Sequence, residues 1–319
     1  MAEPLRLEVR DAVDDGEWSA LIERDPRAHV LQHPEVLRVA MRVDPGASAR
    51  WVEARDGDGA LCAGMGWLER RRFGLRTVVS GPAGLYGGPV ARPEAGEAES
   101  RLARAFEGVE RARTLHRELV WAGPEPPRGR WSGLQPLDAA VLDVDGAADF
   151  DTWLHGALPR SRRKECNRSD RRGLTVAIEP DGASLPAFHP LYAERSAAWG
   201  VPALSLLLLQ QLVRSFAEIF LVVARGPEGD VVGAHVCIDL GDELFAWVGT
   251  TARRKDVFPS TVLVREEARW CHANGRARLN LGSSIGRTGV KNHKELLGAR
   301  ADRRWIVDVD RRPWRRRRT

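Results

Sequence analysis

The sequence contains a strongly basic segment that is suited to binding phosphate groups. Arginine and lysine dominate residues 160–172. Guanidinium groups bind phosphates through paired N–H donors and stack on nucleic-acid bases, so the segment indicates a polyanionic partner. Basic side chains at these spacings surround much of a helix, and some of them must therefore face only solvent. The candidates for phosphate binding are Arg160, Arg163, Lys164 and Arg168.

A second basic run lies at the end of the chain, in residues 311–319. The protein has a formal net charge of +5, and its basic residues are nearly all arginine because only four lysines occur. Such a tail either contacts a polyanion or serves as a solubilising end, and the sequence favours neither interpretation.

Two pairs of neighbouring side chains could act on a substrate. His293 precedes Lys294, so a group that titrates near neutral pH adjoins an ammonium, and His293 could shuttle a proton. Ser283 and Ser284 follow a predicted strand. Their hydroxyl groups either donate hydrogen bonds to a substrate or, as is more common, cap the next helix.

A glycine pair and two isolated histidines allow both functional and structural interpretations. Gly87 and Gly88 belong to the Gly- and Pro-rich residues 81–89. They either let the backbone approach a substrate closely or form a tight turn. For His33 and His235, as for His293, a place in the core or on the surface is the better interpretation.

Other features narrow the class of protein. The four cysteines are far apart and form no C-x-x-C pair, which indicates free thiols and no metal site. The sequence contains no G-x-S-x-G motif, and no Ser/His/Asp set is evident. It has no apolar run of about 20 residues and no signal peptide, so we expect a cytoplasmic protein without a membrane span.

The elements that must position these residues form two similar series. Each half is predicted to contain helices, an antiparallel meander, a long helix and a further strand, which is typical of mixed sheets with flanking helices. Helices are expected at residues 17–23, 34–42, 94–116, 150–155, 160–172, 186–199, 203–216, 259–274 and 290–297. Strands are expected at residues 51–54, 60–68, 76–80, 118–121, 139–144, 174–178, 219–224, 231–240, 244–249, 277–281 and 304–309. We therefore expect an α/β fold with domains at residues 1–145 and 146–310, followed by the basic tail.

Three segments form a pattern when they are taken in order. The first is Tyr86-Gly87-Gly88-Pro89. The second runs from Leu158 through the basic helix to Gly173-Leu174-Thr175-Val176, and the third joins Leu279–Ser284 to His293–Ala299. Together they resemble the Fem-type aminoacyltransferases, a branch of the GNAT superfamily with two tandem GNAT-like domains. In this resemblance Arg163 lies at the position of a recurrent arginine, and residues 293–299 are similar to a Phe-Lys-x-x-Phe-Gly-Ala pattern.

The resemblance implies transfer of an aminoacyl group from aminoacyl-tRNA to an amine. It implies that Lys294 lies at the reaction centre, where an ammonium stabilises the oxyanion or the terminal ribose and phosphate of the tRNA. Arg163 and Arg168 would then hold phosphates. The donor is an activated ester, so aminoacyl-tRNA is expected as a co-substrate and no further cofactor is needed.

Two departures from the family's pattern concern the acceptor. Arg92 occupies the neighbourhood where peptidoglycan-modifying members tend to carry an acidic residue, and only Arg38 and Arg42 offer a basic group on the early helix. The acceptor is therefore either a peptidoglycan precursor or another amine, such as a small peptide or a secondary metabolite.

The sequence leaves other functions open. An acyl-CoA-dependent N-acyltransferase of the GNAT superfamily would hold pyrophosphate near residues 249–259, which are basic but have no glycine after Gly249. A non-catalytic RNA-binding module would explain the basic segments, although no recognised RNA-binding motif is present. A tandem GNAT scaffold without activity is the third alternative.

Overall fold

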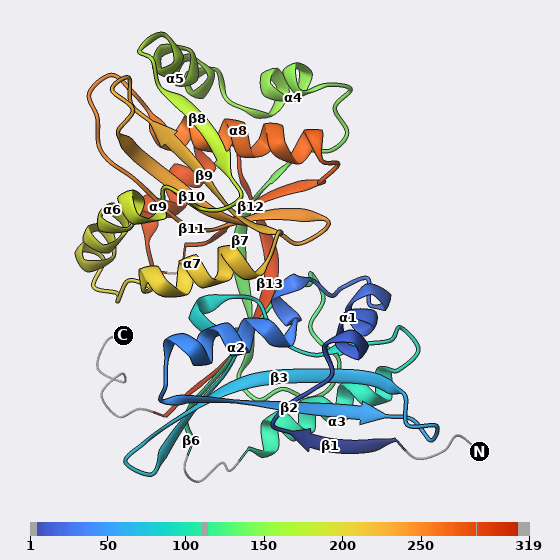
Figure 1. Ribbon diagram of the computed structural model, residues 1–319. Helices are drawn as coiled ribbons and strands as arrows, with labels where there is room; N and C mark the ends of the chain where they lie inside the picture. Colours follow the sequence, from blue (N-terminus) through green and yellow to red (C-terminus); the bar gives the residue numbers. More distant parts are fainter. Residues whose placement is uncertain (1–4, 110–113, 285, 312–319) are drawn as a thin grey trace. The chain divides into compact units, whose positions relative to one another are not determined.

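The chain divides into two units, and its computed structural model describes residues 5–109, 114–284 and 286–311 (Figure 1). One unit contains Met1–Leu137 and Arg303–Thr319, and the other contains Asp138–Asp302. The division falls inside two strands, β7 (Leu134–Asp143) and β13 (Arg300–Asp310). Residue 312 onwards, which includes most of the basic tail, lies outside the described residues.

The first unit has a mixed sheet in the order β1-β2-β3-β4-β6-β13. Its strands besides β13 are β1 (Arg6–Arg10), β2 (Ala47–Arg55), β3 (Leu61–Arg72), β4 (Leu75–Ser80), β5 (Val90–Ala91) and β6 (Thr114–Trp121). Its helices are α1 (Asp15–Arg24), α2 (Pro34–Val43), α3 (Gly96–Gly108) and the 3₁₀ turns η1 (Val30–Gln32) and η2 (Pro82–Gly84). Strands β1 to β4 pair antiparallel, and β4 pairs parallel with β6 across α3. Both relations match the expectation for a meander and for a strand–helix–strand crossover.

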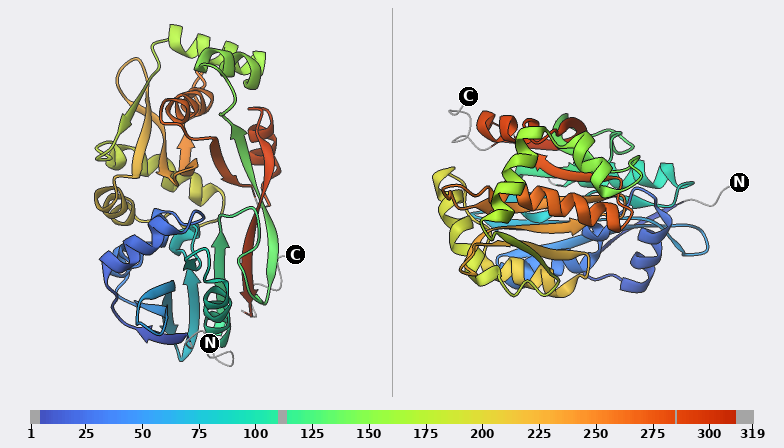
Figure 2. Two further views of the ribbon diagram at one scale, coloured as in Figure 1. Left: turned by 90° about the vertical axis from the view of Figure 1, so that its right-hand side faces the viewer. Right: turned by 90° about the horizontal axis from the view of Figure 1, so that it is seen from above.

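The second unit has a mixed sheet in the order β7-β12-β11-β10-β9-β8. Its strands besides β7 are β8 (Thr175–Glu179), β9 (Ile219–Arg225), β10 (Val231–Asp239), β11 (Glu243–Thr251) and β12 (Arg278–Ser283). Its helices are α4 (Phe150–Ala157), α5 (Arg160–Arg171), α6 (Leu185–Ala198), α7 (Leu206–Ser215), α8 (Pro259–Ala273) and α9 (Thr288–Glu295). Helix α8 packs on one face of this sheet, and α6 and α7 pack on the other (Figure 2). These mixed sheets with flanking helices confirm the predicted α/β class.

Strands β11 and β12 separate along their length. They pair parallel where Glu243–Phe245 faces Arg278–Asn280, whereas β11 continues to Thr251 and β12 to Ser283. Beyond this short ladder, β11 remains paired with β10, and β12 remains paired with β7. The sheet therefore opens between the far halves of β11 and β12, and the residues that follow β12 lie at the edge of this opening.

Local sequence explains the ends of the helices that carry the candidate residues. Helix α5 begins directly after Pro159 and is followed by Gly173, whose φ of 79° is the left-handed conformation that favours glycine. Helix α9 is followed by Gly298 with a φ of 92°, and a Cβ there would lie 2.7 Å from the carbonyl oxygen of Ala157. Both ends are therefore fixed by glycines whose positions other residues fit poorly.

The helix predicted for residues 94–116 is wrong at its C-terminal end. Helix α3 ends at Gly108, and Thr114 to His116 belong to strand β6. The side chains of Thr114 and His116 are buried within the sheet between β4 and β13. Sheet pairing at this position outweighs the helical pattern, because propensity is a weak determinant once tertiary contacts form.

The last strand of each predicted half pairs in the other unit. Strand β7, which was expected to close the first half, pairs antiparallel with β12 in the second unit. Strand β13, expected to close the second half, pairs antiparallel with β6 in the first unit. Relative to the boundary expected after residue 145, the chain enters the second unit earlier and leaves it again at residue 303.

Each unit has its own hydrophobic core. In the second unit, α8 contributes Val262, Leu263 and Ala268, which pack with residues of α4 and of strands β7 to β12. All four cysteines are buried and unbonded. In the described ranges, no group of three or more His, Cys, Asp or Glu side chains is arranged to hold a metal ion. None of the helices described here is long and apolar enough to cross a membrane.

Candidate functional site

Lys294 is held at the end of β12 by two backbone carbonyl groups. Its Nζ donates hydrogen bonds to the oxygen of Gly282 at 2.9 Å and to that of Ser283 at 3.1 Å. Burial and, to a smaller extent, the charge on Arg287 together lower the pKa of Lys294 to about 8. An ammonium has three N–H donors, so two are fixed here and the third remains for a ligand. The lysine is therefore an oriented donor that still carries its charge at neutral pH.

His293 precedes this lysine on α9 and is half-buried. Burial lowers its pKa, and the positive charges of Arg162, His235 and Lys294 add to that effect, while Glu165 opposes it. These effects favour the neutral imidazole, which is able to accept a proton. Strand β12 and helix α9 thus bring the predicted pair together beside the opening of the sheet.

The basic helix α5 divides into side chains that bind the protein and side chains that face solvent. Arg163 donates from Nη1 to the carbonyl oxygens of His155 at 2.8 Å and Leu158 at 2.6 Å, so it ties α5 to the end of α4. Arg168 forms an ion pair with Asp256. Arg160 and Lys164 are exposed. Of the four predicted phosphate ligands, only these last two are free of such internal contacts in the described structure.

Helix α5 also contacts the helix that carries Lys294. Arg162 donates from Nε to the carbonyl oxygen of Leu296 at 3.2 Å and from Nη1 to Glu165 at 2.6 Å. The other carboxylate oxygen of Glu165 accepts from the hydroxyl of Thr261 on α8 at 2.7 Å. This chain of contacts joins α5, α8 and the end of α9.

Gly87 and Gly88 lie in the first unit, in the irregular segment between η2 and β5, where space for a side chain is absent. A Cβ on Gly87 would lie 2.4 Å from the carbonyl oxygen of Ser80, and one on Gly88 would lie 2.8 Å from the ring of Trp121. The φ of Gly88 is 108°, which also favours glycine. Packing inside the first unit is sufficient to explain both glycines.

Ser283 and Ser284 contribute backbone groups to the turn after β12. Ser283 supplies a carbonyl to Lys294, and the carbonyl of Ser284 accepts from the backbone N–H of Arg287 at 2.9 Å. The residue that precedes α9 is Arg287, so neither serine occupies its N-cap. The exposed side chain of Ser283 remains a candidate for substrate contact.

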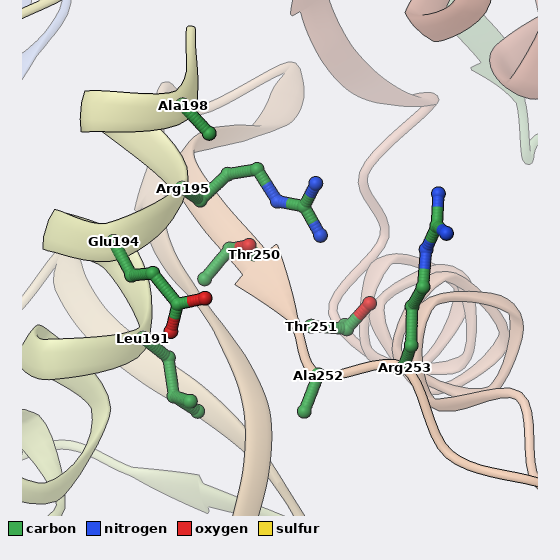
Figure 3. A pocket seen from close by; sticks show the side chains of 8 residues that line it. All are labelled: Leu191, Glu194, Arg195, Ala198, Thr250, Thr251, Ala252 and Arg253. Atoms are coloured by element: carbon green, nitrogen blue, oxygen red, sulfur yellow. The ribbon is translucent and has the colours of Figure 1, made fainter.

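A pocket of about 310 Å³ lies between α6 and the end of β11 (Figure 3). Glu194 and Arg195 extend from α6 towards the strand, and Arg253 stands on the other side (Figure 3). None of these three charged groups forms an ion pair within the described part of the chain. The remaining lining residues are Leu191, Ala198, Thr250, Thr251 and Ala252. A charged pocket of this kind suits a small ligand that carries both an anionic and a cationic group.

Sequence reasoning did not identify this pocket or the buried carboxylate of Glu267. Arg253 stands in the segment considered for pyrophosphate, but Glu194 and Arg195 look like ordinary solvent-facing residues of a helix. Glu267 carried no signal either, because a glutamate on an amphipathic helix is usually exposed. In the structure it is fully buried and accepts a hydrogen bond from His235.

Comparisons with known proteins agree with this architecture. Residues 160–295 match the family model of the acetyltransferase (GNAT) domain. FemX has a TM-score of 0.68 at 11% sequence identity, over 97% of this chain and 99% of that one. L-PGS from Bacillus licheniformis has a TM-score of 0.58 at 12% identity, over 94% and 92% of the two chains.

A third similar structure is a tandem GNAT protein from the clavulanic acid biosynthesis pathway, determined without AcCoA. It has a TM-score of 0.54 at 16% identity, over 97% of this chain and 99% of that one. The comparison of the sequence with curated proteins gives no match. The GNAT domain lies in the second unit and the likeness to these structures extends over both units, so the chain has the tandem GNAT fold of the Fem-type proteins.

Proposed function

We propose that the protein is an acyltransferase that moves an aminoacyl group from aminoacyl-tRNA to an amine. The observation that carries the proposal is the position of Lys294, whose Nζ is fixed by Gly282 and Ser283 beside the opening between β11 and β12. The GNAT domain supports acyl transfer as the class of reaction. The resemblance to the Fem-type family supports aminoacyl-tRNA as the donor.

The reaction needs an oriented amine, an ester and stabilisation of the oxyanion. The amine nitrogen attacks the ester carbonyl, a C–N bond forms, and the C–O bond to the tRNA ribose breaks. The remaining N–H of Lys294 would stabilise the negative charge that develops on the carbonyl oxygen. The amine loses one proton and the leaving oxygen gains one, so the reaction needs no redox cofactor or external energy source.

The donor's phosphates would meet the exposed part of α5. Arg160 and Lys164 face solvent, and Arg168 could exchange its pairing with Asp256 for a phosphate. Phosphate contacts of this kind supply affinity that falls as salt concentration rises.

The acceptor would occupy the pocket between α6 and β11. Arg195 and Arg253 offer guanidinium groups to a carboxylate or phosphate, and Glu194 offers a carboxylate to an ammonium. An amino acid, a short peptide or an amine-bearing metabolite with an acidic group has this pattern of charges. The pocket thus supports a small charged acceptor.

An acyl-CoA-dependent N-acyltransferase is the second candidate, favoured by the match to the GNAT acetyltransferase domain. CoA would place its pyrophosphate at the turn between β11 and α8. That turn carries the carboxylate of Asp256, and Pro259 occupies the first position of α8, where it offers no N–H. Both features oppose pyrophosphate binding, so we place the aminoacyl-tRNA donor first.

The test compares the two donors directly. Purified protein is incubated with a pool of radiolabelled aminoacyl-tRNAs or with labelled acetyl-CoA, and binding is followed as salt is raised. Retention of aminoacyl-tRNA that weakens with salt supports the proposal, and transfer of label to a panel of zwitterionic amines identifies the acceptor class. If the protein retains acetyl-CoA alone and transfers label only from it, the proposed function is replaced by the acyl-CoA-dependent N-acyltransferase.

A further inference from the structure

A buried histidine–glutamate pair lies between strand β10 and helix α8 of the second unit. Glu267 on α8 is 0% exposed, and its Oε1 accepts a hydrogen bond from Nδ1 of His235 on β10 at 2.6 Å. Its other oxygen, Oε2, has no hydrogen-bond partner in the described structure. A fully buried carboxylate costs stability unless a partner compensates it. The sequence therefore retains a costly group whose two polar contacts in the described structure are with His235 and with the weak thiol donor of Cys237 at 3.7 Å.

The neighbouring strand leaves space for the imidazole ring. His235 lies opposite Gly249 in the register of β10 and β11. A Cβ on residue 249 would lie 2.0 Å from Cδ2 and 2.7 Å from Nε2 of His235. Any side chain on residue 249 would displace the ring from Glu267, so Gly249 is required for this arrangement.

The hydrogen bond assigns different roles to the two ring nitrogens. With Glu267 ionised, Nδ1 carries the proton that is donated to the carboxylate, and Nε2 carries a free lone pair. A carboxylate on Nδ1 also stabilises the imidazolium that forms when Nε2 takes up a proton. The side chain of His235 is 16% exposed, so part of it is accessible from solvent.

The pair belongs to the neighbourhood of Lys294. When it is protonated, His235 lowers the pKa of His293, the residue that precedes Lys294 on α9, so the two imidazoles are close enough to interact electrostatically. The titratable and charged groups around this point are Glu267 from α8, His293 and Lys294 from α9, and Arg162 and Glu165 from α5. The strand that carries Gly249 is β11, which lines the opening.

We propose that His235, oriented by Glu267, takes the proton from the acceptor amine during acyl transfer. This inference rests on the function proposed above. As the C–N bond forms, the amine proton moves to Nε2 of His235, while Nδ1 remains bonded to Glu267. As the C–O bond of the ester breaks, Nε2 returns the proton to the leaving oxygen, and the imidazole regains its starting state.

His235→Asn is the central variant because it separates the two roles of the histidine. The asparagine amide can still donate to Glu267 from near the position of Nδ1, so the fold is maintained, but it provides no basic nitrogen. We expect turnover to fall on the order of 10²- to 10⁴-fold, with little change in the KM for the donor. An asparagine variant with wild-type turnover would show that the pair is only structural.

Two further variants test the orientation of the ring. Gly249→Ala should displace the imidazole and reduce turnover, whereas Gly156→Ala, where a Cβ meets nothing within 4 Å, should not. His235→Ala should regain part of its activity with added imidazole, and exposed His155→Ala should show no dependence on imidazole. Failure of imidazole to rescue a folded His235→Ala protein, together with an active Gly249→Ala variant, would overturn the proposal.

The two proposals fail in distinguishable ways. Wild-type protein that transfers label from neither donor refutes the proposed function and, with it, the role of His235. Active wild-type protein with an equally active His235→Asn variant refutes the role of His235 alone.

Discussion

Two lysines on the same short helix differ in burial and therefore in their chemical properties. Lys291 is exposed on α9 and lies 3.8 Å from Glu295, which is a weak surface ion pair. Lys294, one turn further on, is held by Gly282 and Ser283 and has its pKa lowered to about 8. The same residue type therefore has two chemical characters on one helix, and only the second is suited to a reaction centre.

Replacement of these two lysines by methionine tests that contrast. We expect Lys294→Met to reduce turnover on the order of 10²-fold, because a fixed donor to the developing oxyanion is lost. Lys291→Met should remain close to wild type. The measurement is kcat and KM for the donor with both variants, and a Lys294→Met enzyme with wild-type kcat would remove the lysine from the mechanism.

The lowered pKa of Lys294 also predicts a dependence of stability on pH. The unfolded chain keeps the lysine proton up to about pH 10.5, whereas the folded chain releases it near pH 8. Between these values the unfolded state binds more protons, so the free energy of unfolding rises with pH from this group. Thermal denaturation of wild type and Lys294→Met should therefore show the wild type gaining relative stability over this window. A constant difference in Tm would contradict the assignment.

At the scale of elements, helix α5 shows why a basic segment is not the same as a binding surface. Arg163 is committed to the carbonyl groups of His155 and Leu158, while Arg160 and Lys164 extend into solvent. The resemblance to the Fem-type family draws attention to Arg163, but its contacts indicate a part in holding α4 and α5 together. The stability of the protein and the proposed tRNA binding can therefore be tested separately on this helix.

Variants of α5 should separate these effects. Arg163→Ala should cost about 1 kcal/mol of stability, because a charged donor loses one exposed and one partly buried hydrogen bond to backbone carbonyl groups. Arg160→Gln combined with Lys164→Gln should leave Tm unchanged and reduce the slope of log K against log salt for tRNA binding by about 1–2. Thermal melts measure the stability of each variant, and tRNA binding at several salt concentrations measures the slope. An Arg163→Ala protein with unchanged Tm and a reduced slope would show that Arg163 binds phosphate.

Sequence pattern located most elements because their signals are local. Helices α1, α2, α5 and α8 lie within a few residues of their predicted positions, since caps, proline and glycine define their ends. The pairing of β7 with β12 and of β13 with β6 could not be predicted, because pairing between distant strands leaves no local mark. Glu267 was missed for a related reason: its burial depends on how α8 packs and on Gly249 in another strand.

At the scale of the whole molecule, the end of the chain is part of the first unit. Strand β13 pairs with β6 from Trp305 to Asp310, and Val307 is fully buried in the core with Leu119 and Trp121. The second unit has a different core, which includes Val222 on β9. A division after residue 145 assigns β13 to the second unit, whereas the structure assigns most of it to the first. The two assignments make different predictions about the core that β13 stabilises.

A pair of matched valine substitutions distinguishes the two assignments of β13. Val307→Ala should cost about 2 kcal/mol, because it opens a cavity in the core of the first unit. Hydrogen exchange measured by mass spectrometry should then show faster exchange in β6 and β3, with β9 and β10 unchanged. Val222→Ala should produce the reverse pattern, since its side chain belongs to the core of the second unit. Exchange that rises in β9 and β10 after Val307→Ala would assign β13 to the second core, and the contribution of the chain's end to the first unit would have to be abandoned.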